Sequence, residues 1–202
     1  AFVDAGLLQA WGMGDGAISL KNPLSAELAV MRTSLLPGLV AALDRNRKRQ
    51  QLRVRLFEAG RSYHLGEGAP VEIERIAAVA TGDATGEQWS ETKRKLDFFD
   101  IKGDVESLMR LPGIDATSFA FRAGGPAFLH PGRSATIWRN GTPVGFVGAL
   151  DPRLQKQLDL DDDVYVFEVQ FKELSSRQVP TARPLSAPSG ASARGRDQVQ
   201  HR

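Results

Sequence analysis

The chain of 202 residues contains no cysteine, which excludes a disulfide framework and any zinc site built from thiolates. Aromatic residues make up only 7% of the sequence. No apolar run approaches the roughly 20 residues that a membrane-spanning helix needs, and the first residues lack the basic start of a signal peptide. We therefore expect a cytoplasmic protein that has no membrane partner.

The sequence also lacks a large net charge. Its 26 lysines and arginines oppose 24 aspartates and glutamates, for a formal net charge of +2. The positive excess lies in residues 175–202, which hold five arginines and one aspartate. The preceding residues therefore contain 21 basic and 23 acidic side chains, a net charge of −2. This balance gives no basis for inferring nucleic-acid binding by the folded part of the chain.

The sequence divides into two parts. The chain is 42% hydrophobic and 25% charged, as in ordinary globular domains, but residues 175–202 contain few sizeable apolar side chains. Such a segment cannot bury enough surface to offset its ordering entropy. We predict a folded domain over residues 1–174 and a disordered basic tail over residues 175–202, with a nucleic-acid-binding arm as the alternative for the tail.

Two segments have clear periodicity. Apolar residues at helical spacing predict a helix over residues 34–49, with Ser34 as its N-cap, Pro37 in its first turn and cations at its end. Directly after it, apolar residues alternate with arginines, which predicts a half-buried strand over residues 52–58.

The remaining elements set the fold class. A second helix is predicted over residues 97–111, and Asn140-Gly141 predicts a hairpin turn, because both residues tolerate positive φ. Helices and strands do not alternate as βαβ units, so we predict an α+β fold in which helices flank an antiparallel sheet. The further strands are predicted over residues 75–81, 117–122, 134–139, 143–150 and 164–171.

Several clusters could carry chemistry, but each also has a structural explanation. Gly12, Gly14 and Gly16 match neither the dinucleotide fingerprint nor the P-loop, which favours an ordinary loop. His130 and Ser134 form a conceivable base and nucleophile pair, although such proximity is common in serine-containing turns.

Two clusters of charged residues likewise have both a functional and a structural explanation. The carboxylates between Asp97 and Glu106 could hold a hard cation, or they could simply be acidic residues at a helix N-terminus. Residues 45–55 include six lysines or arginines in eleven positions. These cations could contact an RNA backbone, but the stretch lacks interleaved aromatic residues, which favours a solvated helix end and strand face.

A series of short stretches shares order, spacing and residue types with one known family. Together they extend over about residues 2–174. The stretches are 20–25 (LKNPLS), 31–39 (MRTSLLPGL), Asn46 and Arg49, 57–61 (FEAGR), 97–106 (DFFDIKGDVE), 129–135 (LHPGRSA), 144–148 (VGFVG) and 164–168 (VYVFE).

These stretches resemble the core of the bacterial phenylalanyl-tRNA synthetase beta subunit. The resemblance implies a class II aminoacyl-tRNA synthetase-like core in the subunit that does not carry out aminoacylation. In that family the alpha subunit holds the ATP and phenylalanine sites, and the beta core packs against it in an (αβ)₂ assembly. The expected partners are therefore the alpha subunit and, through the assembled enzyme, tRNA(Phe).

The resemblance also implies two sets of site residues. The first forms a motif 1-like helix with its lead-in, at the subunit interface; the apolar residues of this helix exceed what one sheet face needs, which independently suits a partner. The second lies on a motif 2-like strand. The interface set is Met31, Arg32, Thr33, Leu35, Leu36, Leu39, Val40 and Leu43, and the strand set is Phe57, Glu58, Gly60 and Arg61.

Catalytic residues are not expected. An adenylating site of this class needs an arginine on motif 2 to orient the α-phosphate and another after a glycine-rich strand. Arg61 follows Glu58 instead of preceding an acid, and Gly145, Gly148 and Arg153 match the glycine-rich element only faintly. We therefore predict no catalytic residue, no metal site and no cofactor bound by this chain, with ATP and magnesium used by the assembled enzyme.

An alternative hypothesis is a stand-alone ATP-binding, adenylate-forming class II synthetase paralogue that uses Arg61, Arg32 or Arg153. The resemblance further implies that the chain is truncated at both ends. The editing module would lie upstream of its first residue, and the anticodon-binding domain that would follow Ser186 is absent.

Overall fold

The computed structural model describes residues 2–23, 25, 28–86, 93–111 and 113–175. Its main element is a six-stranded sheet of order β3-β4-β8-β7-β6-β5, in which every neighbouring pair is antiparallel. The predicted α+β class with an antiparallel sheet is therefore confirmed. The strands are β3 (Val54–Leu65), β4 (Pro70–Thr81), β5 (Phe119–Ala123), β6 (Leu129–Arg139), β7 (Thr142–Leu150) and β8 (Val164–Gln170).

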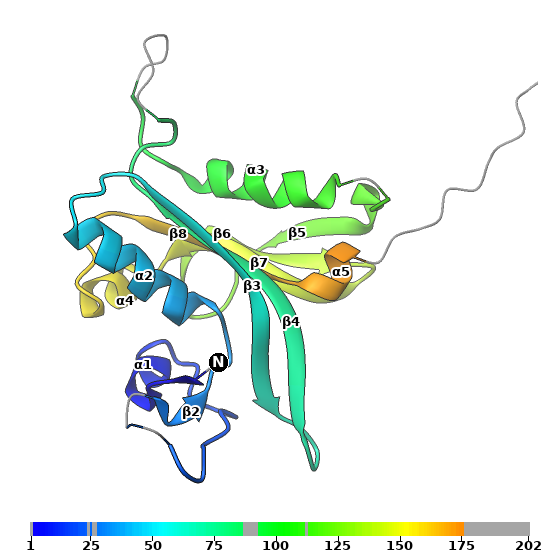
Figure 1. Cartoon of the computed structure of the whole chain (residues 1–202). Helices are drawn as coiled ribbons and strands as arrows, with labels where there is room; N and C mark the ends of the chain where they lie inside the picture. Colours follow the sequence, from blue (N-terminus) through cyan, green and yellow to red (C-terminus); the bar gives the residue numbers. More distant parts are fainter. Residues whose placement is uncertain (1, 24, 26–27, 87–92, 112, 176–202) are drawn as a thin grey trace, which may run out of the picture.

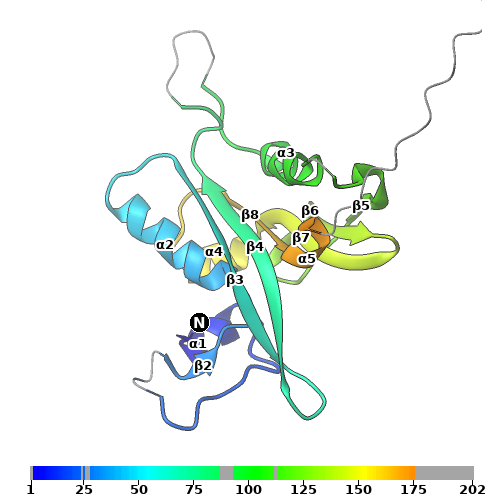
Figure 2. The ribbon, with the colours of Figure 1, turned by 45° about the vertical axis from the view of Figure 1, so that its right-hand side comes forward.

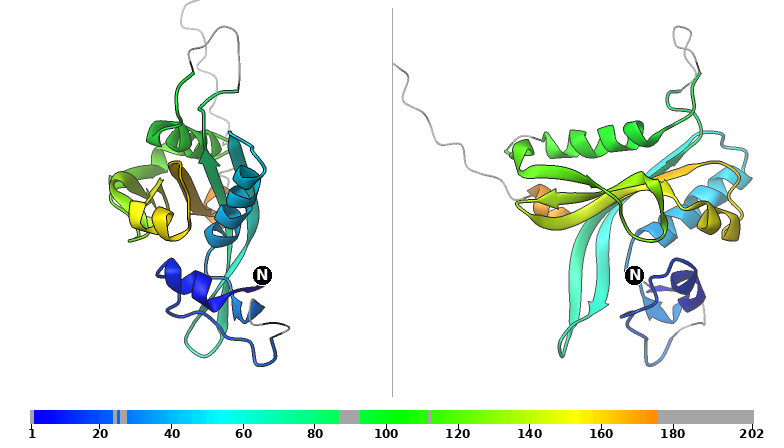
Figure 3. Two further views of the ribbon diagram at one scale, coloured as in Figure 1. Left: turned by 90° about the vertical axis from the view of Figure 1, so that its left-hand side faces the viewer. Right: turned by 180° about the vertical axis from the view of Figure 1, so that it is seen from behind.

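Helices cover both faces of this sheet (Figures 1 and 3). One core contains α2 and α4 with Val164 and Val166 of β8, and the other contains α3 and α5 with Phe167 and Val169 of the same strand. Because neighbouring side chains of a strand point to opposite faces, β8 is buried on both sides and is almost wholly apolar. The helices are α2 (Leu36–Lys48), α3 (Phe98–Met109), α4 (Pro152–Gln157) and α5 (Phe171–Ser175).

A small N-terminal unit completes the fold. Asp4 begins α1 by accepting a hydrogen bond from the backbone N–H of Leu7 at 2.9 Å, and Trp11 after this helix packs against Phe128 with ring centroids 5.5 Å apart. The unit lies beside the far end of the β3–β4 hairpin, which projects beyond the rest of the sheet (Figure 2). Its elements are β1 (Phe2–Val3), α1 (Ala5–Ala10) and β2 (Val30–Met31), and a short 3₁₀ turn, η2 (Ala116–Ser118), precedes β5.

Most predicted elements are confirmed, with shifted ends. The helix predicted over residues 34–49 begins at Leu36, with Leu35 as its N-cap residue, so the assignment of Ser34 as N-cap is wrong. The strand predicted over residues 52–58 starts at Val54 and continues to Leu65. Leu52 precedes it and is 71% exposed, because it lies in the connection from α2 and not in the alternating strand.

The second helix and the hairpin turn are confirmed. Asp97 caps α3 in a reciprocal arrangement with Asp100, and the apolar side chains of Ile101 and Val105 face the core. Asn140 and Gly141 have φ values of 49° and 81°, as the turn between β6 and β7 requires. The predicted tail lies outside the described residues apart from Ser175, so the domain boundary at residue 174 stays a prediction.

Candidate functional site

The N-terminus of α2 meets the sheet at a cluster of charged and polar side chains. We call this cluster the polar junction and define it as Arg32, Ser34, Glu58, Arg75 and Glu168. Its members come from the lead-in to α2 and from β3, β4 and β8. The junction therefore joins the predicted interface segment to the strand predicted to be motif 2-like.

Glu168 is the buried centre of the polar junction. Its side chain stands in the middle of β8 and is only 2% exposed. One carboxylate oxygen accepts hydrogen bonds from the Ser34 hydroxyl at 2.6 Å and from the Leu35 backbone N–H at 3.0 Å, and the other lies 3.1 Å from Arg75 Nε. Burial raises the pKa of Glu168, whereas Arg75, the Ser34 hydroxyl and the Leu35 N–H oppose that rise. The N-terminus of α2 thus faces a carboxylate, the charge that suits its dipole.

Arg32 lies across β3 and is held at both ends of its guanidinium. Its Nη1 donates to Glu58 Oε1 at 2.7 Å, and its Nε donates to the carbonyl oxygen of Arg61 at 2.8 Å. A Cβ atom on Gly60 would lie 2.5 Å from Arg32 Nη2. Glycine at position 60 is therefore needed for the guanidinium to approach the strand so closely.

Arg75 extends the network toward the far end of the hairpin. Its Nε also donates to the Ser62 hydroxyl at 2.7 Å, and its Nη2 lies 3.4 Å from His64 Nε2. The Ser62 hydroxyl is 3.2 Å from the same histidine nitrogen. Burial, together with the nearby Arg75 charge, lowers the pKa of His64. His64 is therefore part of a structural hydrogen-bond network.

The arginines near this site are already engaged. The side chains of Arg32 and Arg75 are only 17% and 13% exposed, and carboxylates bind both. The guanidinium of Arg61 pairs with Glu72 at 3.1 Å and with Glu74 at 3.3 Å across the hairpin. Binding of a triphosphate would require these cations to exchange their carboxylate partners for phosphate. The arrangement fits a structural network better than a nucleotide site.

The two glycines of the faintly matched glycine-rich element have structural roles. Gly145 lies where a Cβ atom would collide with the Glu168 carbonyl oxygen, and a Cβ on Gly148 would come within 2.7 Å of Ser134 Cβ. These glycines therefore allow β7 to pack closely against its neighbours. Arg153 lies on α4, where its backbone N–H donates to the Asp151 carboxylate at 2.8 Å.

The structure changes the argument for the predicted interface helix. The prediction that α2 carries more apolar residues than this chain can cover is wrong. The sheet, Trp11 and Leu154 already cover the apolar face of α2. Met31 pairs with Phe2 in the small sheet, and the Thr33 hydroxyl donates to the Met13 carbonyl oxygen at 3.2 Å. The assignment of these residues to a subunit interface stays a prediction. The buried members of the set are Thr33, Leu35, Leu36, Leu39, Val40 and Leu43.

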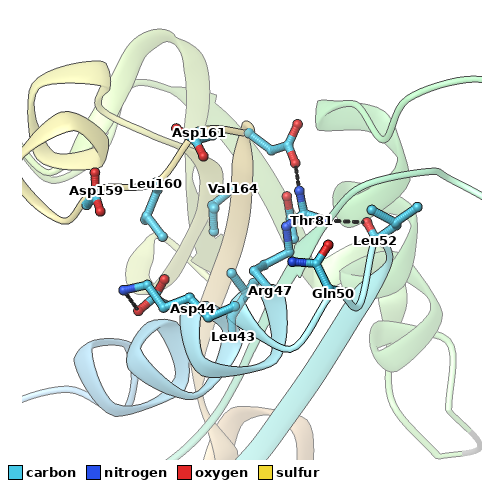
Figure 4. Close-up of a pocket in the computed structure, with 12 residues that line it drawn as sticks. Leu43, Asp44, Arg47, Gln50, Leu52, Thr81, Asp159, Leu160, Asp161 and Val164 are labelled. Carbon is cyan, nitrogen blue, oxygen red and sulfur yellow. Dashed lines mark hydrogen bonds and ion pairs between the residues drawn. The ribbon is translucent and has the colours of Figure 1, made fainter.

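The C-terminal end of α2 borders a cavity of about 310 Å³ (Figure 4). Arg47 pairs with Asp162 at its rim, and Lys48 pairs with Asp44 one helical turn away at 2.8 Å. Asp162 belongs to the acidic turn before β8. Carboxylates bind three of the six cations in residues 45–55, namely Arg47, Lys48 and Arg55. Structural ion pairs therefore account for half of the basic stretch.

The remaining candidate clusters also serve the fold. Arg94 binds Asp100, Arg55 binds Asp104 and Lys102 binds Glu106. Within the described residues, no group of three or more His, Asp or Glu side chains could hold a metal ion. Gly12 and Gly16 have positive φ in a loop, as ordinary turns do.

The conceivable pair of His130 and Ser134 is not formed. Nδ1 of His130 accepts a hydrogen bond from the backbone N–H of Gly132 at 3.0 Å. The Ser134 hydroxyl is buried and finds no hydrogen-bond partner among the described residues.

Sequence analysis missed Arg75 and Glu168 as site residues. The available signal for Glu168 was a single carboxylate within a mostly apolar strand, VYVFEVQ, because a buried charge requires partners. The signal for Arg75 was weaker: it directly follows Glu74 and falls in the register of Ile73 and Ala77 on β4.

The family described as "Phenylalanyl tRNA synthetase beta chain CLM domain" matches residues 1–171. This chain belongs to that family. A phenylalanine–tRNA ligase beta subunit from Xanthomonas campestris is 51% identical over 188 residues, which are 92% of this chain and 23% of the relative. The beta subunits from Xanthomonas euvesicatoria and Xylella fastidiosa are 49% and 47% identical over 189 residues, again 92% of this chain and 24% of each relative.

The family resemblance stated from the sequence is therefore confirmed. The chain spans about a quarter of the length of these beta subunits. Among its described helices, none combines the length and apolar character that crossing a membrane requires.

Proposed function

We propose that this chain is a non-catalytic, class II synthetase-like core module of the phenylalanyl-tRNA synthetase beta subunit. It supports the ATP-dependent attachment of phenylalanine to tRNA(Phe) by packing against the catalytic alpha subunit. The observation that carries this proposal is the engagement of Arg32 and Arg61 by Glu58, Glu72 and Glu74. Arg32 and Arg61 therefore have a structural use, and phosphate could bind them only by displacing their carboxylate partners.

The proposed assembly is (αβ)₂, in which the alpha subunit binds ATP and magnesium and tRNA(Phe) contacts the assembled enzyme. The relatives' name, phenylalanine–tRNA ligase beta subunit, supports an alpha partner. Within this chain, the outward side of α2 is the part of the predicted interface that remains available. Gly38 and Arg45 are exposed there, and nothing lies within 4 Å of a Cβ atom built on Gly38.

Co-expression with the alpha subunit from Xanthomonas campestris tests this assembly. We expect size-exclusion chromatography with light scattering to detect a stoichiometric complex. Leu39 is unsuitable as a probe because it is buried in this chain's own core, so its substitution would unfold the chain. Gly38→Gln instead adds bulk on the outward side of α2 and should weaken the complex.

Gly103→Gln is the matched control, because Gly103 lies on α3 and its Cβ position is equally open. Loss of complex with both variants, or with neither, would contradict an interface on α2. Isothermal titration of the chain alone with ATP and magnesium should detect no heat of binding. Micromolar ATP affinity would instead support an adenylate-forming paralogue.

A further inference from the structure

The outer edge of β3, the edge strand of the main sheet, differs along its length. In its second half the chain covers its own edge. The backbone N–H of Tyr63 donates to the Arg32 carbonyl oxygen at 2.9 Å, and that of Leu65 donates to the Gly16 carbonyl oxygen at 3.1 Å. The backbone groups of these odd-numbered residues therefore point away from β4.

In the part of the chain that the structure describes, no backbone hydrogen bond covers the first half of the same edge. In an antiparallel pair, residues alternate between pointing their backbone groups toward the partner strand and away from it. Since Tyr63 and Leu65 point outward, Arg55, Phe57 and Ala59 do so as well. None of the hydrogen bonds found among the described residues satisfies the outward groups of these three residues. Such an edge is a template for another strand.

An apolar groove follows this open edge. The Phe57 side chain is 76% exposed on the α3 side of β3. Beside it, a groove of about 360 Å³ runs between the β3–β4 hairpin and α3, with Ile76, Ala78 and Leu108 among its lining residues. Alternate side chains of an added strand would enter this groove next to Phe57.

The charges around the edge select the partner. Arg53, which directly precedes β3, is exposed and has no carboxylate partner among the described residues. Arg53 instead donates to the carbonyl oxygens of Asp83 and Ala84. A second copy paired antiparallel about Phe57 would place Arg53 opposite Arg61, and like charges that face each other across strands are destabilising. An acidic segment complements the same surface.

We propose that the edge formed by residues 55–59 binds an extended, acidic polypeptide segment as an additional antiparallel strand. The apolar side chains of this segment occupy the groove beside Phe57, and its carboxylates lie near Arg53. This inference goes beyond the proposed function, because it concerns β3 and not the outward side of α2. The two proposals can therefore be tested separately. Experiments could contradict assembly with the alpha subunit through α2 and still support strand addition to β3, or the other way round.

The probe is a fluorescein-labelled peptide, acetyl-Thr-Val-Thr-Val-Thr-Val-Asp-Glu-amide, whose binding to the full chain is followed by fluorescence anisotropy. In the antiparallel register its valines lie opposite residues 55, 57 and 59, with their N–H groups toward β3. We expect saturable binding. N-methylation of the three valines, or replacement of Asp-Glu by Lys-Lys, should weaken binding by about tenfold or more.

Two variants test the edge itself. Ala59→Pro removes an outward N–H without removing a bond to β4, and Phe57→Ser removes the exposed ring; each should weaken binding by about tenfold. Phe99→Ser on α3 is the matched control, because Phe99 is 74% exposed, and it should leave binding unchanged. Unfolding midpoints confirm that each variant is folded.

The proposal is overturned if the chain does not bind the peptide, or if it binds the N-methylated peptide equally well. It is also overturned if sedimentation detects a dimer that Ala59→Pro abolishes, because the edge would then belong to a second copy. Tighter binding of the Lys-Lys peptide would overturn the acidic character of the partner.

Discussion

The two ends of α2 carry similar chemistry in different surroundings. At the N-terminus, Glu168 is buried and is bound by Ser34, Leu35 and Arg75. At the C-terminus, Arg47 and Lys48 pair with aspartates around an open cavity (Figure 4). Each end places charges that suit the helix dipole. Burial makes the difference, because an exposed ion pair contributes little, whereas breaking a buried pair leaves an uncompensated charge.

The largest expected effect comes from breaking the buried end. Glu168→Ala should lower the free energy of unfolding by about 3–5 kcal/mol, because it leaves Arg75 buried without its carboxylate. Asp162→Ala at the partly exposed end should cost about 1 kcal/mol or less. Urea denaturation followed by circular dichroism measures both. Equal losses would show that burial does not separate the two ends.

A smaller effect is expected from the hydroxyl that connects α2 to Glu168. The Ser34 hydroxyl donates to Glu168 and accepts from the Leu36 backbone N–H at 3.1 Å. Ser34→Ala should therefore lower the free energy of unfolding by about 1–2 kcal/mol. Ser107→Ala is the control, since the Ser107 hydroxyl is exposed and donates only to the Gly103 carbonyl oxygen. A cost at Ser107 as large as that at Ser34 would contradict this assignment.

The smallest effect concerns pH and has opposite signs at two carboxylates. Arg133 lowers the pKa of Asp163 below the ordinary value of 3.8, so its stabilising contribution is present above that value and is lost as the pH falls through the lowered pKa. Burial raises the pKa of Glu168 above the ordinary 4.5, so its contribution is present below 4.5 and is lost as the pH rises through the raised pKa.

Denaturation of three proteins at about pH 3 to 7 tests this difference. Asp163→Asn should reduce the loss of stability on acidification. Glu168→Gln should make stability increase more steeply with pH than in the unsubstituted chain. If the two variants change the slope in the same direction, one of the two pKa directions is wrong.

Local patterns predicted much of the fold. The apolar period of α2, the alternation in β3 and the Asn140-Gly141 turn each depend on neighbouring residues alone, so the sequence was enough to find them. The ends of the elements were less predictable. Ser34 has the residue type of an N-cap, but its hydroxyl also binds Glu168, and α2 begins two residues later.

The candidate site depended on long-range contacts. Arg32 and Glu58 were named from the sequence, but their pairing joins residues 26 positions apart. Ser34 and Glu168 are separated by 134 positions. Sequence periodicity carries no information about such distant partners. Arg32 and Glu58 could therefore be named but not paired, and Glu168 was missed as a site residue.

The sequence by itself determined the fold class, most of the elements and the family, because these follow from local periodicity and from the order of short motifs. The tertiary structure alone decided which charges are buried and where apolar side chains are covered. It placed Glu168 at the N-terminus of α2, used the apolar face of α2 within the chain and left the first half of the β3 edge without a partner among the described residues. The physical reason is that burial and pairing depend on the approach of distant segments, and this approach sets the energetic contribution of each charge.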